Sequence, residues 1–327
     1  MDPVARPATS DRHDPGSRRV VPPSPSTIDL HSHTARSDGL LEPIELATTA
    51  RAAGVRLLSI TDHDTLAGYR ELRAQASGAA VADGDALAGL ELLPGVELNA
   101  VMGDRPELIE SEVHVLGLGV DPDDEAFEAI LQRQRGERRV RFGRMVDRLR
   151  ETGMPIDSAL AEVPPAGDED ALGRPTLARA MVTLGYATSV EDAFVRFLSR
   201  GRPAYVPRGG LGPIEAISAI RAARGVPSLA HFSEGAERRD LMAELIAAGL
   251  QGLEVYHGSF DAPTVERMHV LATELRLLET GGTDFHGDRE TYAEAHARLW
   301  VPPEVEAPLR EALRGEALRG EAFRADA

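Results

Sequence analysis

The chain of 327 residues carries 36 lysine or arginine residues against 53 acidic residues, a formal net charge of −17, and contains no cysteine. All 36 are arginine, which excludes Schiff-base catalysis, a phosphate-binding P-loop lysine and a carbamylated-lysine metal bridge. The lack of cysteine excludes thiol catalysis, thiolate zinc sites and disulfides. The acidic balance argues against binding to duplex nucleic acid, which depends on basic side chains displacing counterions.

Composition indicates a globular protein, because 42% of residues are hydrophobic and 27% are charged. The length suits one large domain or two modest ones. No apolar stretch approaches the roughly 18 residues needed to span a membrane, and residues 1–26 lack the apolar core of a secretory signal. We therefore predict a cytoplasmic protein with no membrane contact and with a disordered leader over residues 1–26.

Beyond the leader, short apolar runs alternate with stretches of helical period, which is typical of a mostly parallel sheet or barrel. The predicted strands cover residues 27–31, 56–61, 92–97, 113–118, 227–231, 252–256 and 277–281. The helices predicted between them include residues 43–53, 236–248 and 263–275. Gly54 and Gly249 are expected to end the first two of these helices.

The alternation stops between about residues 121 and 208. This stretch predicts a long helix over 123–151, a Pro- and Asp-rich loop over 164–170, and two shorter helices over 175–184 and 190–198. We expect a helical insertion over 121–208 that sits over one end of the barrel and divides it into parts 27–120 and 209–303. The repeated LREA-LRGEA-LRGEAF predicts a frayed helical tail over 304–327.

Potential metal ligands recur at the ends of the predicted strands. His31 and His33 close the first strand and project from the same face, so both can bind one cation. A His-x-His pair alone is weak evidence, because a single His more often serves as a core or surface imidazole. The later strands also end in, or begin near, such residues: Asp62, His63, Asp64, Glu97, His114, His231, Asp284 and His286. Because strand ends converge on one face of an α/β barrel, we predict a shared metal site.

Six segments, in this order, resemble the polymerase and histidinol phosphatase (PHP) family of phosphoesterases. They read DLHSHTARSDG (29–39), ITDHDT (60–65), PGVE (94–97), VHVLG (113–117), LAHF (229–232) and GTDFHG (282–287). The resemblance implies an α/β fold, a distorted (β/α)7 barrel, which agrees with the seven predicted strands. Phe232 and Thr283 replace the Pro and Ser that are usual in the family, but neither is a ligand position.

The resemblance further implies two to three divalent metal ions, of manganese, zinc or iron. The implied ligands are His31, His33, Glu97 and Asp284 for one cation; Glu97 as a bridge, His114 and His231 for a second; and Asp38, His63 and His286 for a third. In such a centre a metal-bridging hydroxide held by Glu97 attacks phosphorus directly, with Asp284 and His231 as candidates for proton transfer. Asp62 and Asp64 are expected to orient the ligand imidazoles, with helix capping as the alternative for Asp64.

The prediction that the substrate contains phosphate groups rests on arginines in and near the insertion. The predicted long helix holds eight: Arg133, Arg135, Arg138, Arg139, Arg141, Arg144, Arg148 and Arg150. One or two of them, Arg135 included, are expected to reach the pocket, with a solvated helix face as the alternative. GRPT (173–176) and GRPAYV (201–206) resemble segments of PHP members that act on nucleoside 3′,5′-bisphosphates and short RNA 5′ ends, although Thr176 stands where a His is usual. Because a guanidinium binds phosphate bidentately, Arg174 and Arg202 are predicted to hold a second phosphate.

A further pocket residue is predicted at His257, just past the sixth strand, with a surface loop position as the alternative. The predicted function is a metal-dependent phosphoesterase hydrolysing a phosphate monoester of a small phosphorylated metabolite, namely a nucleoside 3′,5′-bisphosphate or a short single-stranded RNA 5′ end. The oligomeric state does not follow from the sequence.

The sequence supports four alternative functions less well than it supports this one. Histidinol-phosphate phosphatase would need an anionic partner for the substrate ammonium, which the Arg-rich insertion disfavours. A non-catalytic metal-binding regulatory protein would tolerate the loss of ligands, whereas all nine positions are filled. A proofreading exonuclease module would normally accompany a polymerase. An amidohydrolase frequently uses a lysine bridge, which this chain lacks.

Overall fold

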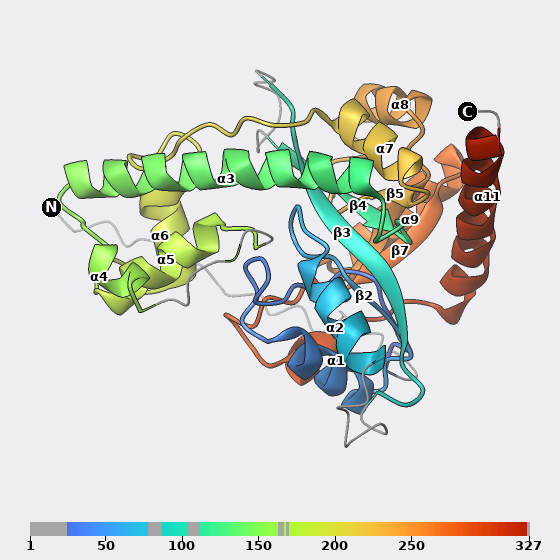
Figure 1. The fold of residues 1–327 in the computed structure, drawn as a ribbon, viewed down its shortest axis with the longest axis horizontal. Helices are drawn as coiled ribbons and strands as arrows, with labels where there is room; N and C mark the ends of the chain where they lie inside the picture. The colour runs from blue at the N-terminus through green and yellow to red at the C-terminus, as the bar shows by residue number, and fades with distance from the viewer. Residues whose placement is uncertain (1–24, 78–86, 104–111, 163–166, 168–169, 326–327) are drawn as a thin grey trace, which may run out of the picture.

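The computed structural model describes residues 25–77, 87–103, 112–162, 167 and 170–325 (Figure 1). Most of the predicted leader and of the predicted loop over 164–170 therefore lies outside the described residues. Ser26, however, belongs to the folded part. It is buried, and its hydroxyl donates a hydrogen bond to the Ile28 carbonyl at 2.7 Å.

Seven strands form one sheet in chain order, and all seven predicted strands are present. They are β1 (Ile28–Asp29), β2 (Leu57–Ile60), β3 (Glu91–Val101), β4 (Glu112–Leu118), β5 (Val226–Leu229), β6 (Gly252–His257) and β7 (Leu278–Gly282). The backbone N–H of Leu30 donates to Gly281 O at 3.0 Å, and Ser32 and Phe285 form a parallel bridge, so β7 returns to β1. The prediction of an α/β barrel is confirmed.

Strand β4 runs against its neighbours, because it pairs antiparallel with both β3 and β5 while the other neighbouring pairs are parallel. Its beginning therefore lies at the barrel end where the other strands finish. This reversal explains why His114, near the start of β4, lies beside ligands that follow other strands. Strand β3 also continues past Glu97 to Val101, farther than predicted, because its second half pairs with β4.

Helices cover the outside of the barrel. They are α1 (Pro43–Ala52), α2 (Ala67–Ser77), α7 (Pro213–Ala222), α8 (Arg239–Ala247), α9 (Ala262–Leu275) and α10 (Tyr292–His296). Gly54 and Gly249 follow α1 and α8 with φ of 103° and 105°, the left-handed conformation that ends helices. Across the described ranges, we find no helix with the length and apolar character needed to cross a bilayer.

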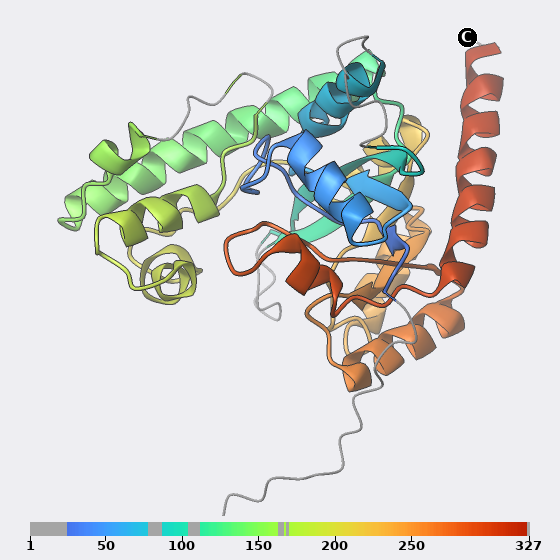
Figure 2. The same ribbon diagram turned by 90° about the horizontal axis from the view of Figure 1, so that it is seen from below.

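The insertion has its own hydrophobic core, which α3 connects to the barrel. Its helices are α3 (Glu125–Glu151), α4 (Asp157–Leu160), α5 (Arg174–Thr183) and α6 (Val190–Ala193), which continues into a π-helical turn (Phe194–Leu198). At the start of α3, Phe127 and Leu131 are buried in the barrel core, whereas Met145 and Leu149 are buried among the insertion helices. This one long helix therefore holds the insertion beside the barrel (Figures 1 and 2).

The C-terminal segment is a short 3-10 turn (Pro303–Val305) followed by α11 (Glu306–Ala325). The predicted tail is helical, but its first turns pack on the barrel. Leu309 is 1% exposed within a cluster that includes Leu116 and Val226. Figure 2 shows α11 at the side of the molecule away from the insertion.

We expect Leu131→Ala to lower the free energy of unfolding by about 2–5 kcal/mol, because the substitution leaves a cavity where α3 contacts the barrel. Leu131 is fully buried. Val140→Ala on the same helix is the control, since Val140 is 51% exposed and should change stability by less than about 0.5 kcal/mol. Chemical denaturation of both variants tests this. Equal effects would show that α3 is not anchored through Leu131.

Candidate active site

All nine predicted ligands meet at one end of the barrel, around Glu97. His33 Nε2 lies 3.2 Å from both Glu97 Oε2 and Asp284 Oδ1. His31 Nε2 lies 3.5 Å from Glu97 Oε1 and 3.3 Å from Asp284 Oδ1. These four side chains come from three segments that are far apart in the sequence. They form a first group of donors, which matches the predicted first cation site.

Glu97 also contacts the other two groups. His114 Nδ1 and His231 Nε2 lie 2.7 and 3.2 Å from Glu97 Oε1 and 3.1 Å from each other. On the other side of the carboxylate, His63 Nδ1 lies 2.8 Å from Glu97 Oε2. The side chain of Glu97 is 1% exposed. Its two oxygens are therefore shared among imidazoles of all three predicted cation sites.

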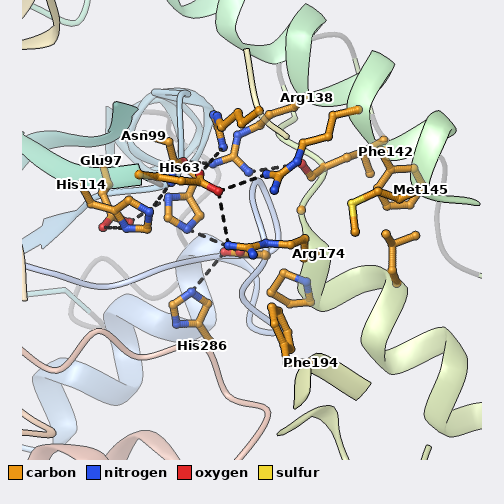
Figure 3. Close-up of a pocket in the computed structure, with 18 of the residues that line it drawn as sticks. His63, Glu97, Asn99, His114, Arg138, Phe142, Met145, Arg174, Phe194 and His286 are labelled. Atoms are coloured by element: carbon orange, nitrogen blue, oxygen red, sulfur yellow. Dashed lines mark hydrogen bonds and ion pairs between the residues drawn. The ribbon is translucent and has the colours of Figure 1, made fainter. Parts of the chain in front are cut away.

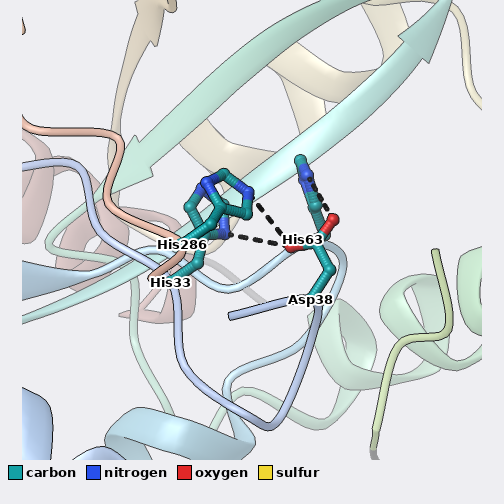
Figure 4. Close-up of side chains that lie close together, drawn as sticks. All are labelled: His33, Asp38, His63 and His286. Carbon is teal, nitrogen blue, oxygen red and sulfur yellow. Dashed lines mark ion pairs between the residues drawn. The ribbon is translucent and has the colours of Figure 1, made fainter. Parts of the chain in front are cut away.

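The third group centres on Asp38, as Figure 4 shows. Asp38 Oδ2 lies 3.5 Å from His63 Nε2, and Asp38 Oδ1 lies 3.2 Å from His286 Nε2. The ring of His33 stacks against that of His286, with centroids 4.2 Å apart. The insertion supports this group, because Arg179 Nη1 donates to Asp38 O at 3.2 Å.

Several donor atoms of this cluster are buried without a hydrogen bond. Within the described part of the chain they are His31 Nε2, both ring nitrogens of His33, His63 Nδ1 and Glu97 Oε2. Buried polar atoms are ordinarily hydrogen-bonded, so such a concentration calls for another partner. The atoms converge on one another, and every donor is nitrogen or oxygen, a set that suits divalent ions such as manganese, zinc or iron. The residues therefore fit a metal centre.

Charges within the cluster support one another. Burial alone would raise the pKa of Glu97, but the imidazoles of His63, His114 and His31 hold it well below its usual range. Burial likewise opposes charge on His286, yet the carboxylates of Asp38 and Asp284 raise its pKa to about 10. For His63 burial prevails and lowers the pKa to about 4. Glu97 therefore carries its negative charge at neutral pH.

Backbone strain also concentrates here. His231 and Asp284 adopt φ values of 34° and 52°, a region that non-glycine residues rarely occupy. Hydrogen bonds hold both residues in place: His231 N donates to Glu254 Oε2 at 2.7 Å, and Asp284 N donates to His31 O at 2.8 Å. The fold thus directs both side chains toward the cluster at some energetic cost.

Glu254 is a site residue that was not predicted, and the carboxylates of Asp62 and Asp64 form no hydrogen bond to a ligand imidazole. Glu254 on β6 is buried, and its Oε1 lies 3.1 Å from His31 Nδ1, which leaves Nε2 of that ring facing the cluster. The sequence feature that could have indicated Glu254 is the presence of a glutamate within an otherwise apolar strand. The carboxylate of Asp62 instead accepts hydrogen bonds from Thr34 and Ser37 and so holds the loop that carries Asp38.

Asp64 contacts arginines rather than imidazoles and caps no helix. Its Oδ2 accepts from Arg138 Nε at 2.6 Å and from Arg208 Nη2 at 2.5 Å. Asp64 is fully buried, with a φ of 52°. Asp64 therefore links Arg138 on α3 to Arg208, which lies in the segment after the insertion helices.

A cavity of ≈ 180 Å³ opens between the cluster and the insertion (Figure 3). We call it the first chamber. Four arginines line it: Arg138, Arg141, Arg174 and Arg208. Arg141 Nη2 and Arg208 Nε are buried and lack a hydrogen-bond partner among the residues described. Two of the guanidiniums that line the chamber therefore each keep one buried N–H group without a protein acceptor.

One further carboxylate, Glu112, lies among these guanidiniums. Its oxygens are 3.3 Å from Arg141 Nη1 and 3.5 Å from both Arg174 Nη2 and Arg208 Nη1. Burial would raise the pKa of Glu112, but these arginines hold it at about 2. Glu112 and Asp64 thus place two negative charges among four positive ones.

Of the predicted substrate contacts, only Arg174 lines the first chamber. Arg202 is exposed on a turn, because the rest of its segment is fixed by Ala204 and Val206, which are buried in the insertion core. Arg135 is buried, but Nη1 donates to Asp64 O and Nη2 to Glu128. The structure therefore places neither Arg202 nor Arg135 at the first chamber.

His257 is buried rather than on the surface, and it contacts a predicted ligand. Its Nε2 lies 3.3 Å from Asp284 Oδ2, and its Nδ1 lies 2.8 Å from Ser259 Oγ. It does not line the first chamber.

A buried cluster of nitrogen and oxygen donors, facing guanidiniums across a small chamber, defines a metal-dependent phosphoester hydrolase. Comparisons with known proteins agree. A family model for the PHP domain matches residues 29–155. The chain is 30% identical over 275 residues to the 3′,5′-nucleoside bisphosphate phosphatase of Chromobacterium violaceum, covering 81% of this chain and 89% of that protein. The chain belongs to the PHP family.

Two more similarities extend over most of the chain. It is 32% identical over 290 residues to the 5′-3′ exoribonuclease Rnm of Salmonella typhimurium, covering 85% of this chain and 91% of that protein. The structure of an amidohydrolase from Chromobacterium violaceum, with bound sulfate and no metal, superposes with a TM-score of 0.73 at 29% identity. That match covers 89% of this chain and 97% of the other.

Proposed function

We propose that the protein hydrolyses a phosphate ester of a nucleoside 3′,5′-bisphosphate, or of the equivalent 5′ end of a short RNA. The observation that carries the proposal is the first chamber, which has the ligand cluster on one wall and four guanidiniums on another. A substrate with two phosphates fits this arrangement, because one phosphate can react at the cluster while the other is held by arginines. One relative is named a 3′,5′-nucleoside bisphosphate phosphatase, and another is named a 5′-3′ exoribonuclease.

The charge of the first chamber favours this substrate over histidinol phosphate. Outside the ligand cluster, four guanidiniums face Asp64 and Glu112, which leaves a net positive charge toward the cavity. A substrate ammonium would be repelled by this wall. The carboxylate of Glu112 is already shared by three arginines and so is not available to pair with an ammonium.

We propose that the three groups of donors described above would hold the cations; Glu97 contacts histidines of all three groups. Bound there, divalent ions supply a nucleophile by lowering the pKa of water and neutralise charge on the phosphate. The number and identity of the ions belong to this proposal. Glu254 and Asn99 hold the rings of His31 and His114 from behind, which fixes the ring nitrogens that face the cluster.

We propose that one of two residues moves the proton that the leaving oxygen needs. The side chains of His231 and Asp284 are 31% and 25% exposed, the highest values among the nine donors, and both line the first chamber. Asp284 Oδ2 also lies within reach of His257 Nε2. We assign proton transfer to Asp284, which is oriented by His257 and would take the proton released by the attacking water and pass it to the leaving oxygen; His231 is the second candidate.

Replacing Arg174 tests the proposal. Arg174→Ala should reduce kcat/KM on adenosine 3′,5′-bisphosphate by about 10- to 150-fold, the range for one charge-assisted phosphate contact, with a much smaller loss on adenosine 5′-monophosphate. Phosphate release from both substrates, and from histidinol phosphate, is the measurement.

Arg202→Ala is the matched control, because Arg202 is exposed and lies outside the first chamber, and it should behave as the wild type. An equal loss for Arg174→Ala on both substrates would show that Arg174 serves the reacting phosphate or the fold. Faster release from histidinol phosphate than from the bisphosphate would overturn the proposed substrate.

A further inference from the structure

Among the described residues that line the first chamber, Glu112 is the only carboxylate outside the nine donors. It begins β4, and its side chain is 3% exposed. Because β4 runs against its neighbours, this strand begins at the end of the barrel where the donors gather. His114 lies two residues further along β4, and residues at this spacing project from the same face of a strand. A negative charge is therefore fixed beside the ligand cluster, in the wall that the arginines form.

Three guanidiniums surround this carboxylate, but none of them binds it closely. Oε1 lies 3.3 Å from Arg141 Nη1 and 3.5 Å from Arg174 Nη2, and Oε2 lies 3.5 Å from Arg208 Nη1. Charge-assisted hydrogen bonds between such groups are ordinarily about 2.7–2.9 Å long. Oε1 is buried and accepts no hydrogen bond from the described part of the chain. Glu112 therefore neutralises the guanidiniums without using up their N–H groups.

Other carboxylates near the site are bound more fully. Asp64 accepts hydrogen bonds from two guanidiniums at 2.6 and 2.5 Å and does not line the first chamber. Glu290 lines a second cavity and contacts both terminal nitrogens of Arg298. Asp64 and Glu290 thus have the close contacts of structural ion pairs. The looser contacts of Glu112 fit a group that shares its partners with another anion.

The guanidiniums have donors left for such an anion. Arg141 Nη2 and Arg208 Nε are buried, and each lacks an acceptor among the described residues. A phosphate group offers three terminal oxygens as acceptors, one more than a carboxylate. A phosphate in the first chamber and Glu112 therefore compete for the same arginines. Their negative charges also repel each other, and this repulsion is strong in a site that is largely shielded from water.

Building on the proposed function, we propose that Glu112 limits the affinity of the first chamber for the phosphate that is not cleaved. With no nucleotide bound, its carboxylate neutralises the buried guanidiniums and keeps them together. With a nucleotide bound, the same charge opposes the phosphate. The product, which keeps that phosphate, is therefore held less tightly and leaves more readily.

The Glu112→Gln protein should bind adenosine 5′-monophosphate at least about 10-fold more tightly than the wild type, and KM for adenosine 3′,5′-bisphosphate should fall by a similar factor. The substitution hardly changes side-chain volume, but it leaves the guanidiniums without this counter-charge. Because an interaction between charges scales with the charge of the ligand, the gain should be about 3-fold for the singly charged methyl ester of adenosine 5′-monophosphate and absent for adenosine. A merely structural role of Glu112 cannot produce this gradation.

Isothermal titration calorimetry of the metal-loaded protein with these three ligands is the measurement, and steady-state kinetics gives KM and kcat separately. Circular dichroism verifies folding. Thermal unfolding adds a second readout. Without ligand, the Glu112→Gln protein should unfold at a lower temperature than the wild type, because buried positive charges lose their partner. The same concentration of adenosine 5′-monophosphate should then raise its unfolding temperature more than that of the wild type.

Glu316→Gln is the matched control, because Glu316 is a buried glutamate 3.6 Å from Arg221 and lines neither cavity. Glu112→Asp keeps the charge and should keep the affinity within about 3-fold of the wild type. Weaker or unchanged binding of adenosine 5′-monophosphate by folded Glu112→Gln protein would overturn the proposal, as would an equal gain with adenosine. If the wild type does not hydrolyse the bisphosphate, the proposed function fails instead, while calorimetry still decides the role of Glu112.

Discussion

Chelation of the purified protein is expected to abolish phosphate release, and addition of manganese or a similar divalent ion is expected to restore it. Nine nitrogen and oxygen donors converge around Glu97, and several are buried without a hydrogen bond, so cations are needed to satisfy them. Without those cations the centre loses both its source of a nucleophile and its charge neutralisation. Elemental analysis after reconstitution should find two to three ions per chain.

A second readout of the same experiment is thermal unfolding. Ions that bind only the folded state raise its stability, so the chelated protein should unfold at a lower temperature and recover on reconstitution. Fewer than one bound ion per chain after reconstitution would contradict a centre of several metals. Undiminished activity in excess chelator would contradict metal dependence itself.

Glu97→Gln is expected to reduce turnover by at least about 10²-fold, the scale of removing one electrostatic stabiliser from an active site. The substitution hardly changes side-chain volume. It removes the negative charge and one of the two oxygens that lie within 3.5 Å of His31, His33, His63, His114 and His231. Steady-state kinetics measures the loss, and elemental analysis should show fewer bound ions.

The control for this substitution is Glu151→Gln, because Glu151 is an exposed glutamate at the end of α3. It should keep wild-type turnover and metal content. A folded Glu97→Gln protein with near-normal activity would show that Glu97 does not connect the cation sites.

Two of the arginines that line the first chamber belong to a helical pattern on α3. Phe127, Leu131, Met145 and Leu149 recur at helical spacing along its buried face. Arg135, Arg138 and Arg141 fall on the same face, and of these Arg138 and Arg141 line the first chamber. No helical pattern identifies Arg208, because this residue lies in an irregular segment. The contacts of Arg208 with Asp64 and Glu112 hold it in place.

The sequence by itself determined the seven strands and the donors at their ends. Short apolar runs and the residues that end them indicate strands from local sequence alone. The barrel then brings the strand ends together. Tertiary structure alone decided the reversal of β4, the role of Glu254, and which arginines face the site. Strand direction and the orientation of a guanidinium depend on packing against segments that are distant in the chain. Arg174 and Arg202 illustrate the limit: both occur in a Gly-Arg-Pro segment, but only Arg174 lies where the insertion meets the barrel.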